Sequence, residues 1–268
     1  MESYSTAVNL EKDLDEIPAL DSSKMRLFQI LEDENCDIRD VERIIQTDAA
    51  MSAKVIKLAN SAFFRHAKQI AGIHDAVLTI GFDMVKCITL SMAVMRTFGN
   101  ASRVSKELWR HAYAVALISF DCGRDKQERD TLFSGGLFHD LGRMVLLYKR
   151  PDLYIPLMEV KGSWPEQDIE QEIFQLDHTT IGERVADHWQ FPAQVCDIIR
   201  HHHAPASRSS AIIHLANQVV HEQLRNIPID ISPCLDRVEE FLGEDYKNLV
   251  NSMVSRYKQN SPTIGNLM

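Results

Sequence analysis

A histidine and an aspartate stand side by side as His139 and Asp140, within the sequence GGLFHDLGR of residues 135–143. Imidazole nitrogen and carboxylate oxygen together suit a divalent metal ion, and we take iron, manganese, zinc or magnesium as the candidates. A bound ion lowers the pKa of a coordinated water, so that hydroxide can attack phosphorus, and Arg143 would neutralise a phosphate oxygen. The pair therefore indicates a metal site that could hydrolyse a phosphoester, with Asp140 and Arg143 as its catalytic residues.

An isolated His-Asp pair has a simpler interpretation, because such residues near a helix end commonly cap the helix or bond to its backbone. This chain, however, contains 11 histidines. Four of them stand at three places in the chain where facing helices could complete a metal site. These four are His111, His178, His202 and His203. The others are expected at the surface or at helix ends; they are His66, His74, His188, His201, His214 and His221.

The order of these residues resembles that of the HD superfamily of metal-dependent phosphohydrolases. A histidine comes first, then the His-Asp pair, then a histidine, two adjacent histidines and a final position after Leu215 and Ala216. The resemblance implies metal ligands at His111, His139, Asp140, His178, His202 and His203.

Two departures from that superfamily weaken the enzyme interpretation. The final ligand of the family is an aspartate, whereas this chain has Asn217, which keeps an acceptor oxygen but lacks the negative charge. We call this a degenerate ligand position. Residues 203–207, with the sequence HAPAS, also lack the Gly-Tyr-Pro element of the cyclic dinucleotide phosphodiesterases of the superfamily. Hydrolysis of cyclic di-GMP is therefore not indicated.

The elements that must position these residues are predicted to be helices. Gly and Pro number only 11 and 9, and runs of alternating β-branched residues bounded by turns are essentially missing. We therefore predict an all-α fold. Apolar residues at helical spacing predict, among others, a helix over residues 128–148 that carries the His-Asp pair and a helix over 235–257, with a frayed tail after Gln259.

The N-terminal half contains a longer and more specific pattern. Residues 17–20 (IPAL), 47–62 (TDAAMSAKVIKLANSA), 73–76 (IHDA) and 79–81 (TIG) resemble the HDOD domain, although Asp21 and Ala49 replace frequent prolines. The resemblance extends from about residue 15 to about 225. It implies a bacterial signalling module of two helical lobes, generally a non-catalytic relative of the HD phosphohydrolases, whose input is a partner protein or a small ligand.

Four segments are expected from these patterns. They are an N-terminal extension (1–14), an N-terminal helical lobe (15–102), an HD-like helical lobe (103–225) and C-terminal helices with a tail (226–268). The junction between the lobes is expected at the polar residues 100–105.

Composition narrows the partners and the cellular compartment that are expected for the protein. The net charge of −9 and the pI near 5.6 argue against general nucleic-acid binding, which requires basic surface. No run approaches the roughly 18 to 20 apolar residues that span a bilayer, so no membrane association is expected. Five cysteines without a CxxC pair are typical of reduced thiols. We therefore expect a cytoplasmic protein.

Two functions are compatible with these observations. The favoured one is a regulatory module of bacterial signal transduction that acts through a protein partner or a small ligand and retains a degenerate HD-type metal site. The alternative is a metal-dependent phosphohydrolase acting on a nucleotide or another phosphoester. A nucleic-acid-linked regulator is a weaker third hypothesis, because the chain is acidic.

Overall fold

The computed structural model describes residues 37–61, 63–64, 69–98, 102–161, 164–225 and 228–266. All regular secondary structure in these ranges is helical, which confirms the predicted all-α class. The expected extension over residues 1–14 lies outside the described residues.

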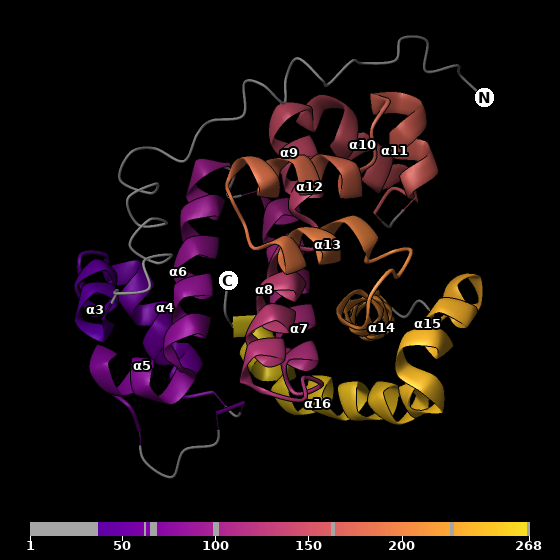
Figure 1. Cartoon of the computed structure of the whole chain (residues 1–268). Helices are drawn as coiled ribbons and strands as arrows, with labels where there is room; N and C mark the ends of the chain where they lie inside the picture. The colour runs from indigo at the N-terminus through magenta and orange to yellow at the C-terminus, as the bar shows by residue number, and fades with distance from the viewer. Residues whose placement is uncertain are drawn as a thin grey trace.

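The first four described helices fall within the predicted N-terminal lobe. They are α3 (Ile38–Gln46), α4 (Ala49–Ala59), α5 (Ile73–Ile80) and α6 (Phe82–Thr97). Aspartates begin α3 and α4, because the carboxylates of Asp37 and Asp48 accept hydrogen bonds from backbone N–H groups of the first turn. Figure 1 shows α3, α4 and α5 together at one side of the molecule, with α6 between them and the remaining helices.

Eight further helices form the part of the chain that carries the candidate ligands. They are α7 (Arg103–Phe120), α8 (Lys126–Phe138), α9 (Leu141–Lys149), α10 (Pro151–Lys161), α11 (Gln167–Phe174), α12 (His178–His188), α13 (Ala193–His201) and α14 (Arg208–Arg225). Helices α7 and α8 pack closely in the middle of the molecule (Figure 1). Helix α13 packs against α8 of this central pair, whereas α12 packs against α9 and α13 and so adjoins the pair through them.

Two glycines permit close approach of these helices. A Cβ atom at Gly136 of α8 would lie 2.7 Å from the Cα atom of Ala116 in α7. A Cβ atom at Gly142 of α9 would lie 1.9 Å from the carbonyl oxygen of His178, where α12 begins. Any side chain at these positions would force the helices apart, so glycine here sets how closely the histidine-bearing segments approach.

The prediction of one helix over residues 128–148 was wrong. Helix α8 ends at Phe138 and α9 begins at Leu141, with His139 and Asp140 in the break between them. Apolar residues continue at helical spacing through the break, which is why the sequence does not show it. The break takes Asp140 out of a continuous helix and directs it into the histidine cluster.

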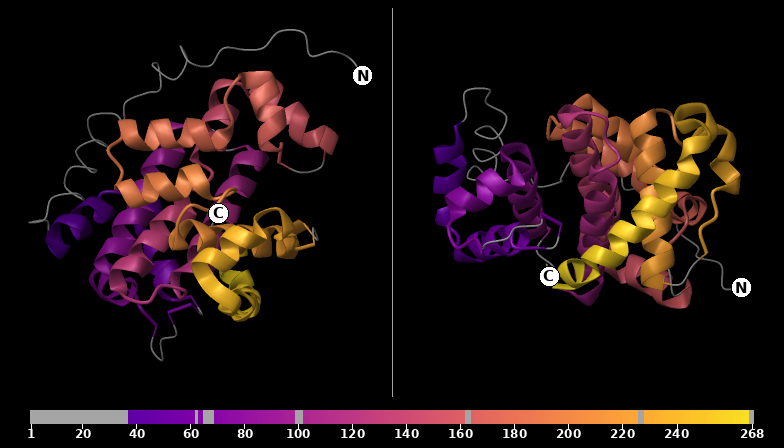
Figure 2. Two further views of the ribbon diagram at one scale, coloured as in Figure 1. Left: turned by 45° about the vertical axis from the view of Figure 1, so that its right-hand side comes forward. Right: turned by 90° about the horizontal axis from the view of Figure 1, so that it is seen from below.

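The C-terminal segment also differs from the prediction. The expected helix over 235–257 is divided by Gly243 (φ 63°) into α15 (Leu235–Leu242) and, after a short 3₁₀ turn, α16 (Tyr246–Asn266). The tail after Gln259 is helical rather than frayed, because α16 packs on α7 and α14 and buries Asn260 and Ile264. Figure 2 shows α16, in yellow, crossing the molecule.

Among the described helices, none is by itself long and apolar enough to cross a membrane. Only α5 and α6 taken together meet the length and composition criteria, and they are bent by 110° to one another.

Candidate metal centre

The six predicted ligands lie in one buried cluster, assembled from four segments of the chain. They form two groups of three, and within each group the ligand atoms lie within 4.8 Å of one another. The open triad, as we call it, contains His111 of α7 with His139 and Asp140 of the α8–α9 break. The braced triad contains His178 at the start of α12 with His202 and His203 directly after α13.

In the braced triad three imidazole nitrogens point toward one another. Nδ1 of His178 donates to Glu170 Oε2 at 2.5 Å, and Nδ1 of His202 donates to the carbonyl oxygen of Ile199 at 2.9 Å. In their neutral forms both rings therefore carry the lone pair on Nε2. Nε2 of His178 lies 3.4 Å from Nε2 of His202 and 3.1 Å from Nε2 of His203. Nitrogen lone pairs converging in this way are the arrangement that a cation stabilises.

The open triad has one histidine held in the same manner and one that is not. Nδ1 of His139 donates to the carbonyl oxygen of Gly136 at 2.7 Å, which leaves Nε2 facing Asp140 Oδ2 at 3.2 Å. His111 instead uses Nε2 to donate to Asn217 Oδ1 at 2.8 Å, and the same nitrogen is 3.9 Å from Asp140 Oδ2. Metal binding at His111 would require this N–H to give up its proton.

Asp140 lies between the two triads. Its Oδ2 atom faces the open triad, while its Oδ1 atom is 3.7 Å from Nε2 of His178 and 3.8 Å from Nε2 of His202. Burial alone would raise the pKa of Asp140, but His139 and Arg143 outweigh it and hold this pKa well below its usual range. The carboxylate is therefore ionised and can serve ions on either side.

Three of the imidazoles are in the protonation state that metal binding requires. Burial lowers the pKa of His111, His202 and His203 well below the usual value for histidine, and neighbouring histidines lower it further. These rings are therefore neutral, which is the ligand form. Neutral nitrogens, an ionised carboxylate and fixed Nδ1 atoms together fit a divalent transition-metal ion such as zinc, iron or manganese.

Arg143 is placed differently from the role that the sequence suggested. Its guanidinium is buried and donates through Nε to Asp140 Oδ1 at 2.9 Å and through Nη1 to Glu170 Oε1 at 3.0 Å. The same Nη1 contacts Tyr154 Oη at 3.0 Å and the carbonyl oxygen of Pro165 at 2.9 Å. These contacts favour a role in orienting Asp140 over the predicted contact with a substrate phosphate.

Glu170 and Tyr154 support the cluster and were not found from the sequence. Glu170 Oε2 accepts from both Nδ1 and the backbone N–H of His178, while Oε1 accepts from Tyr154 at 2.7 Å. Burial would raise the pKa of Glu170, but His178 and Arg143 lower it below its usual value. Glu170 lies in QDIEQEIF, where one buried glutamate among several acidic and amide residues gives no separate signal.

Two histidines expected at the surface lie at the cluster instead. His214 is buried, and its Nδ1 donates to the carbonyl oxygen of His202 at 2.8 Å. The ring of His221 lies 4.6 Å from that of His111, and burial lowers its pKa to about 4. Both lie on α14, which packs on α7 and α13 and so brings them inward. His74 and His188 are exposed as predicted, and His66 lies outside the described residues.

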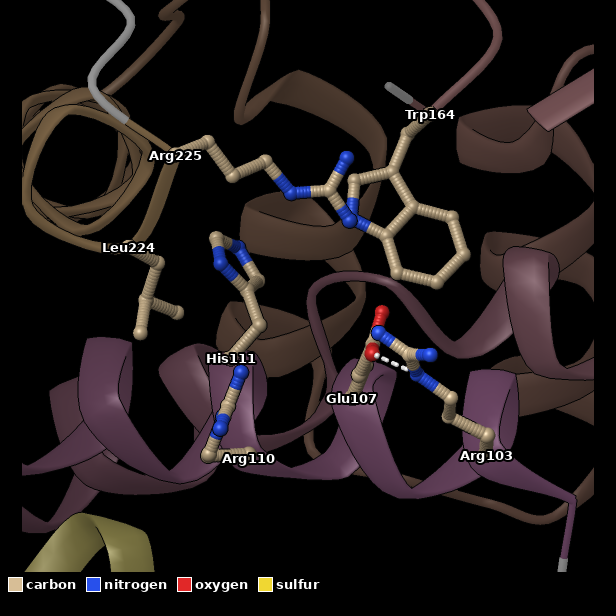
Figure 3. Close-up of a pocket in the computed structure, with 7 residues that line it drawn as sticks. All are labelled: Arg103, Glu107, Arg110, His111, Trp164, Leu224 and Arg225. Atoms are coloured by element: carbon tan, nitrogen blue, oxygen red, sulfur yellow. Dashed lines mark hydrogen bonds and ion pairs between the residues drawn. The ribbon is translucent and has the colours of Figure 1, made fainter. Parts of the chain in front are cut away.

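A cavity of 310 Å³ adjoins the open triad at His111 (Figure 3). Its other lining residues are Arg103, Glu107, Arg110, Trp164, Leu224 and Arg225. The cluster is therefore reached from one side through a pocket that carries more basic than acidic groups.

The sequence matches the family model of the HDOD domain over residues 17–205, which confirms the resemblance noted in the N-terminal half. Among curated proteins, an uncharacterised protein of Treponema pallidum is 25% identical over 202 residues. The alignment covers 74% of this chain but only 39% of that protein, so this chain spans about two-fifths of the length of its relative.

Several solved structures share the fold at low sequence identity. A candidate phosphohydrolase from Shewanella amazonensis SB2B has a TM-score of 0.75 at 20% identity, covering 97% of this chain and 98% of that one. An HDOD domain protein from Geobacter sulfurreducens has a TM-score of 0.73 at 22% identity, covering 96% and 95% of the two chains. A candidate signal transduction protein from Marinobacter aquaeolei VT8 has a TM-score of 0.71 at 21% identity, covering 98% of this chain and 62% of that one.

Proposed function

We propose, since this chain belongs to the HDOD domain family, that it is a regulatory module of bacterial signal transduction that responds to a small ligand or a protein partner at a divalent-metal centre. The observation that carries the proposal is the pair of triads, with Asp140 of the open triad also facing the braced triad. His139, His178, His202 and His203 would hold the ion or ions together with Asp140, and His111 would complete the open triad.

The charge of the ligand set supports binding rather than turnover. Among the six candidate ligands Asp140 is the one carboxylate, and Arg143 occupies its Oδ1 atom at 2.9 Å. Asn217 supplies a neutral oxygen where the superfamily has an aspartate. A divalent ion in this setting keeps much of its positive charge, which favours an anionic ligand, and the second carboxylate that would orient a nucleophilic water is missing from the set.

Elemental analysis of the purified protein tests the proposal most directly. We expect stoichiometric transition metal in the wild type and none in a His139→Ala, Asp140→Ala variant. His188→Ala is the matched control, because this histidine is exposed at the end of α12, and it should retain the metal. Equal metal content in wild type and double variant would refute a metal centre at the triads.

The metal-dependent phosphohydrolase remains the second candidate, and one observation favours it. The cluster offers enough donors for two ions even without a carboxylate at position 217, and a bound ion would supply an activated water and polarise a phosphoryl oxygen. Wild type loaded with manganese, iron or zinc should be screened with generic phosphoesters beside the His139→Ala, Asp140→Ala variant. Turnover present in the wild type and absent in the variant would replace the regulatory proposal.

The setting that we propose is the bacterial cytoplasm, with a signalling protein or a small ligand as partner. The net charge of −9 makes nucleic acid an unsuitable partner. Magnesium is the least suitable of the candidate ions, because five of the six donors are imidazoles and magnesium prefers oxygen ligands.

A further inference from the structure

The cavity beside His111 carries two arginines that form no ion pair within the described part of the chain. Among the described residues, no carboxylate lies within ion-pair distance of Arg110 or Arg225. The one acidic residue of the lining, Glu107, is paired with Arg103 at 3.0 Å. The cavity therefore keeps an excess of positive charge beside the open triad, although the chain as a whole is acidic.

Both arginines are partly buried. Burying a charge without an ion-pair partner costs free energy of folding. The guanidinium of Arg225 lies over the ring of Trp164 at 5.0 Å, and burial lowers the pKa of this arginine. Nε of Arg110 and Nε1 of Trp164 are buried donors that have no hydrogen-bond partner among the described residues. Donors of this kind usually have an acceptor in the functional state of a protein.

The shape of the cavity suits an organic phosphate. Figure 3 shows Arg225 extending toward Trp164 and the His111 ring between Leu224 and Trp164 in this view. Leu224 and the edge of the largely buried Trp164 are the apolar residues that line the cavity next to the arginines. The volume of 310 Å³ is at the lower end of the range for small-molecule pockets, about 300 to 1,000 Å³. This volume exceeds that of a bare phosphate ion and accommodates a ligand of roughly mononucleotide size.

We infer that this cavity binds a small phosphomonoester, with Arg110 and Arg225 on the phosphate and Trp164 and Leu224 against the organic group. Arginine is well suited to the phosphate because its planar fork donates two parallel hydrogen bonds. The inference deepens the proposed function by naming the ligand class, and it rests on that function only in linking the ligand to the metal through His111. The binding step itself requires no metal.

Calorimetric titration of the whole chain with AMP, adenosine and inorganic phosphate tests this inference. Chelator-treated and metal-loaded protein are both titrated, so that loss of the metal centre and failure of the phosphate site give different results. We expect AMP to bind both forms, adenosine to bind at least about tenfold more weakly because it lacks the charged group, and AMP affinity to fall with added salt. Metal-free wild type that binds AMP would support the cavity even if the protein holds no metal.

Variants locate the site. Arg110→Gln with Arg225→Gln should weaken AMP binding by about a hundredfold, since each charge-assisted contact accounts for roughly tenfold, while metal content stays unchanged. Arg237→Gln is the control, because this arginine is exposed in α15 and pairs with Glu240. Equal affinity of wild type and double variant, or equal binding of AMP and adenosine by wild type, would overturn the inference. If the double variant fails to fold, the comparison of AMP with adenosine binding by the wild type still tests the inference. If the protein bound inorganic phosphate but not AMP, the inference that the ligand is a phosphomonoester would be wrong.

Discussion

His178 and His202 of the braced triad each have Nδ1 held by an acceptor, Glu170 and the carbonyl oxygen of Ile199, so that both Nε2 atoms face a common point. In the open triad, His111 donates its Nε2 proton to Asn217 and borders a cavity. The two triads thus differ both in composition, three imidazoles against two imidazoles and a carboxylate, and in the hydrogen bonds that support their histidines. Imidazoles held in a fixed orientation can bind an ion with little rearrangement. A ring that has a competing hydrogen bond and borders a cavity can instead change its contacts.

This difference suggests a division of roles within one cluster. The braced triad is expected to bind metal more tightly, because little rearrangement is needed there. The open triad is expected to bind metal weakly and to change its contacts when a ligand enters the cavity at His111. Asp140 joins the two roles, since its oxygens face opposite triads.

Removal of the shared carboxylate should have the largest effect, because it affects both triads at once. We expect Asp140→Ala to lose all bound metal and to lower the free energy of unfolding by about 3 kcal/mol, since Arg143 loses one buried acceptor but keeps Glu170. Elemental analysis and urea unfolding measure the two effects. Asp187→Ala, an exposed change in α12, should alter neither. Retention of full metal in Asp140→Ala would show that the triads do not share a ligand.

A change at Gly142 should separate the triads without removing any ligand. Because a Cβ atom there would lie 1.9 Å from the carbonyl oxygen of His178, Gly142→Ala must push α9 away from α12. We expect a loss of about 2 to 3 kcal/mol in the free energy of unfolding and weaker metal binding, as for an overpacked core.

Gly72→Ala provides the comparison for this substitution. The nearest atom to a Cβ at Gly72 is 3.9 Å away, so its cost should be below about 1 kcal/mol and reflect only its place at the start of α5. If both glycine variants are equally stable and bind metal equally well, the close approach of α9 and α12 does not hold the triads together.

Glu170→Gln tests the bracing itself. Glutamine retains an oxygen acceptor but loses the charge that fixes His178, so metal affinity should fall by roughly 10- to 100-fold, as is typical for a partner of a metal ligand. Competition with a chromogenic chelator measures this. Glu172→Gln is the matched control, because this glutamate lies exposed on the same helix. Equal affinities of the two variants would mean that the braced triad does not depend on Glu170.

The sequence predicted the residues that gather in the cluster better than the residues that support them. His111, His178, His202 and His203 could be selected because they are ligand-type residues in the order of a known superfamily, and the structure brings them together. Their partners could not, because a carbonyl such as that of Ile199 belongs to every residue and Glu170 resembles its solvated neighbours. Only the packing of α11 against α12 distinguishes it.

The fold class followed from composition, whereas breaks and cavities did not. The helix break at His139 interrupts no apolar pattern. At the break Asp140 faces His178 and His202, which are distant in the chain. The cavity depends on Trp164 of one segment facing Arg225 of another, a relation that no local pattern contains. Pairing of residues far apart in sequence is what the structure adds.

Asn217→Asp should have the smallest effect, confined to the open triad. An aspartate would add a charged ligand where the amide now accepts from His111 at 2.8 Å, so metal affinity should rise by about tenfold, since affinity follows the charge of the ligand set. Asn251→Asp, at an exposed position on α16, adds the same charge away from the cluster and should leave affinity unchanged. An unchanged affinity in Asn217→Asp would place the ion wholly in the braced triad. A tighter ion without phosphoester turnover would show that the missing charge limits binding in the open triad and that its restoration is not sufficient for catalysis.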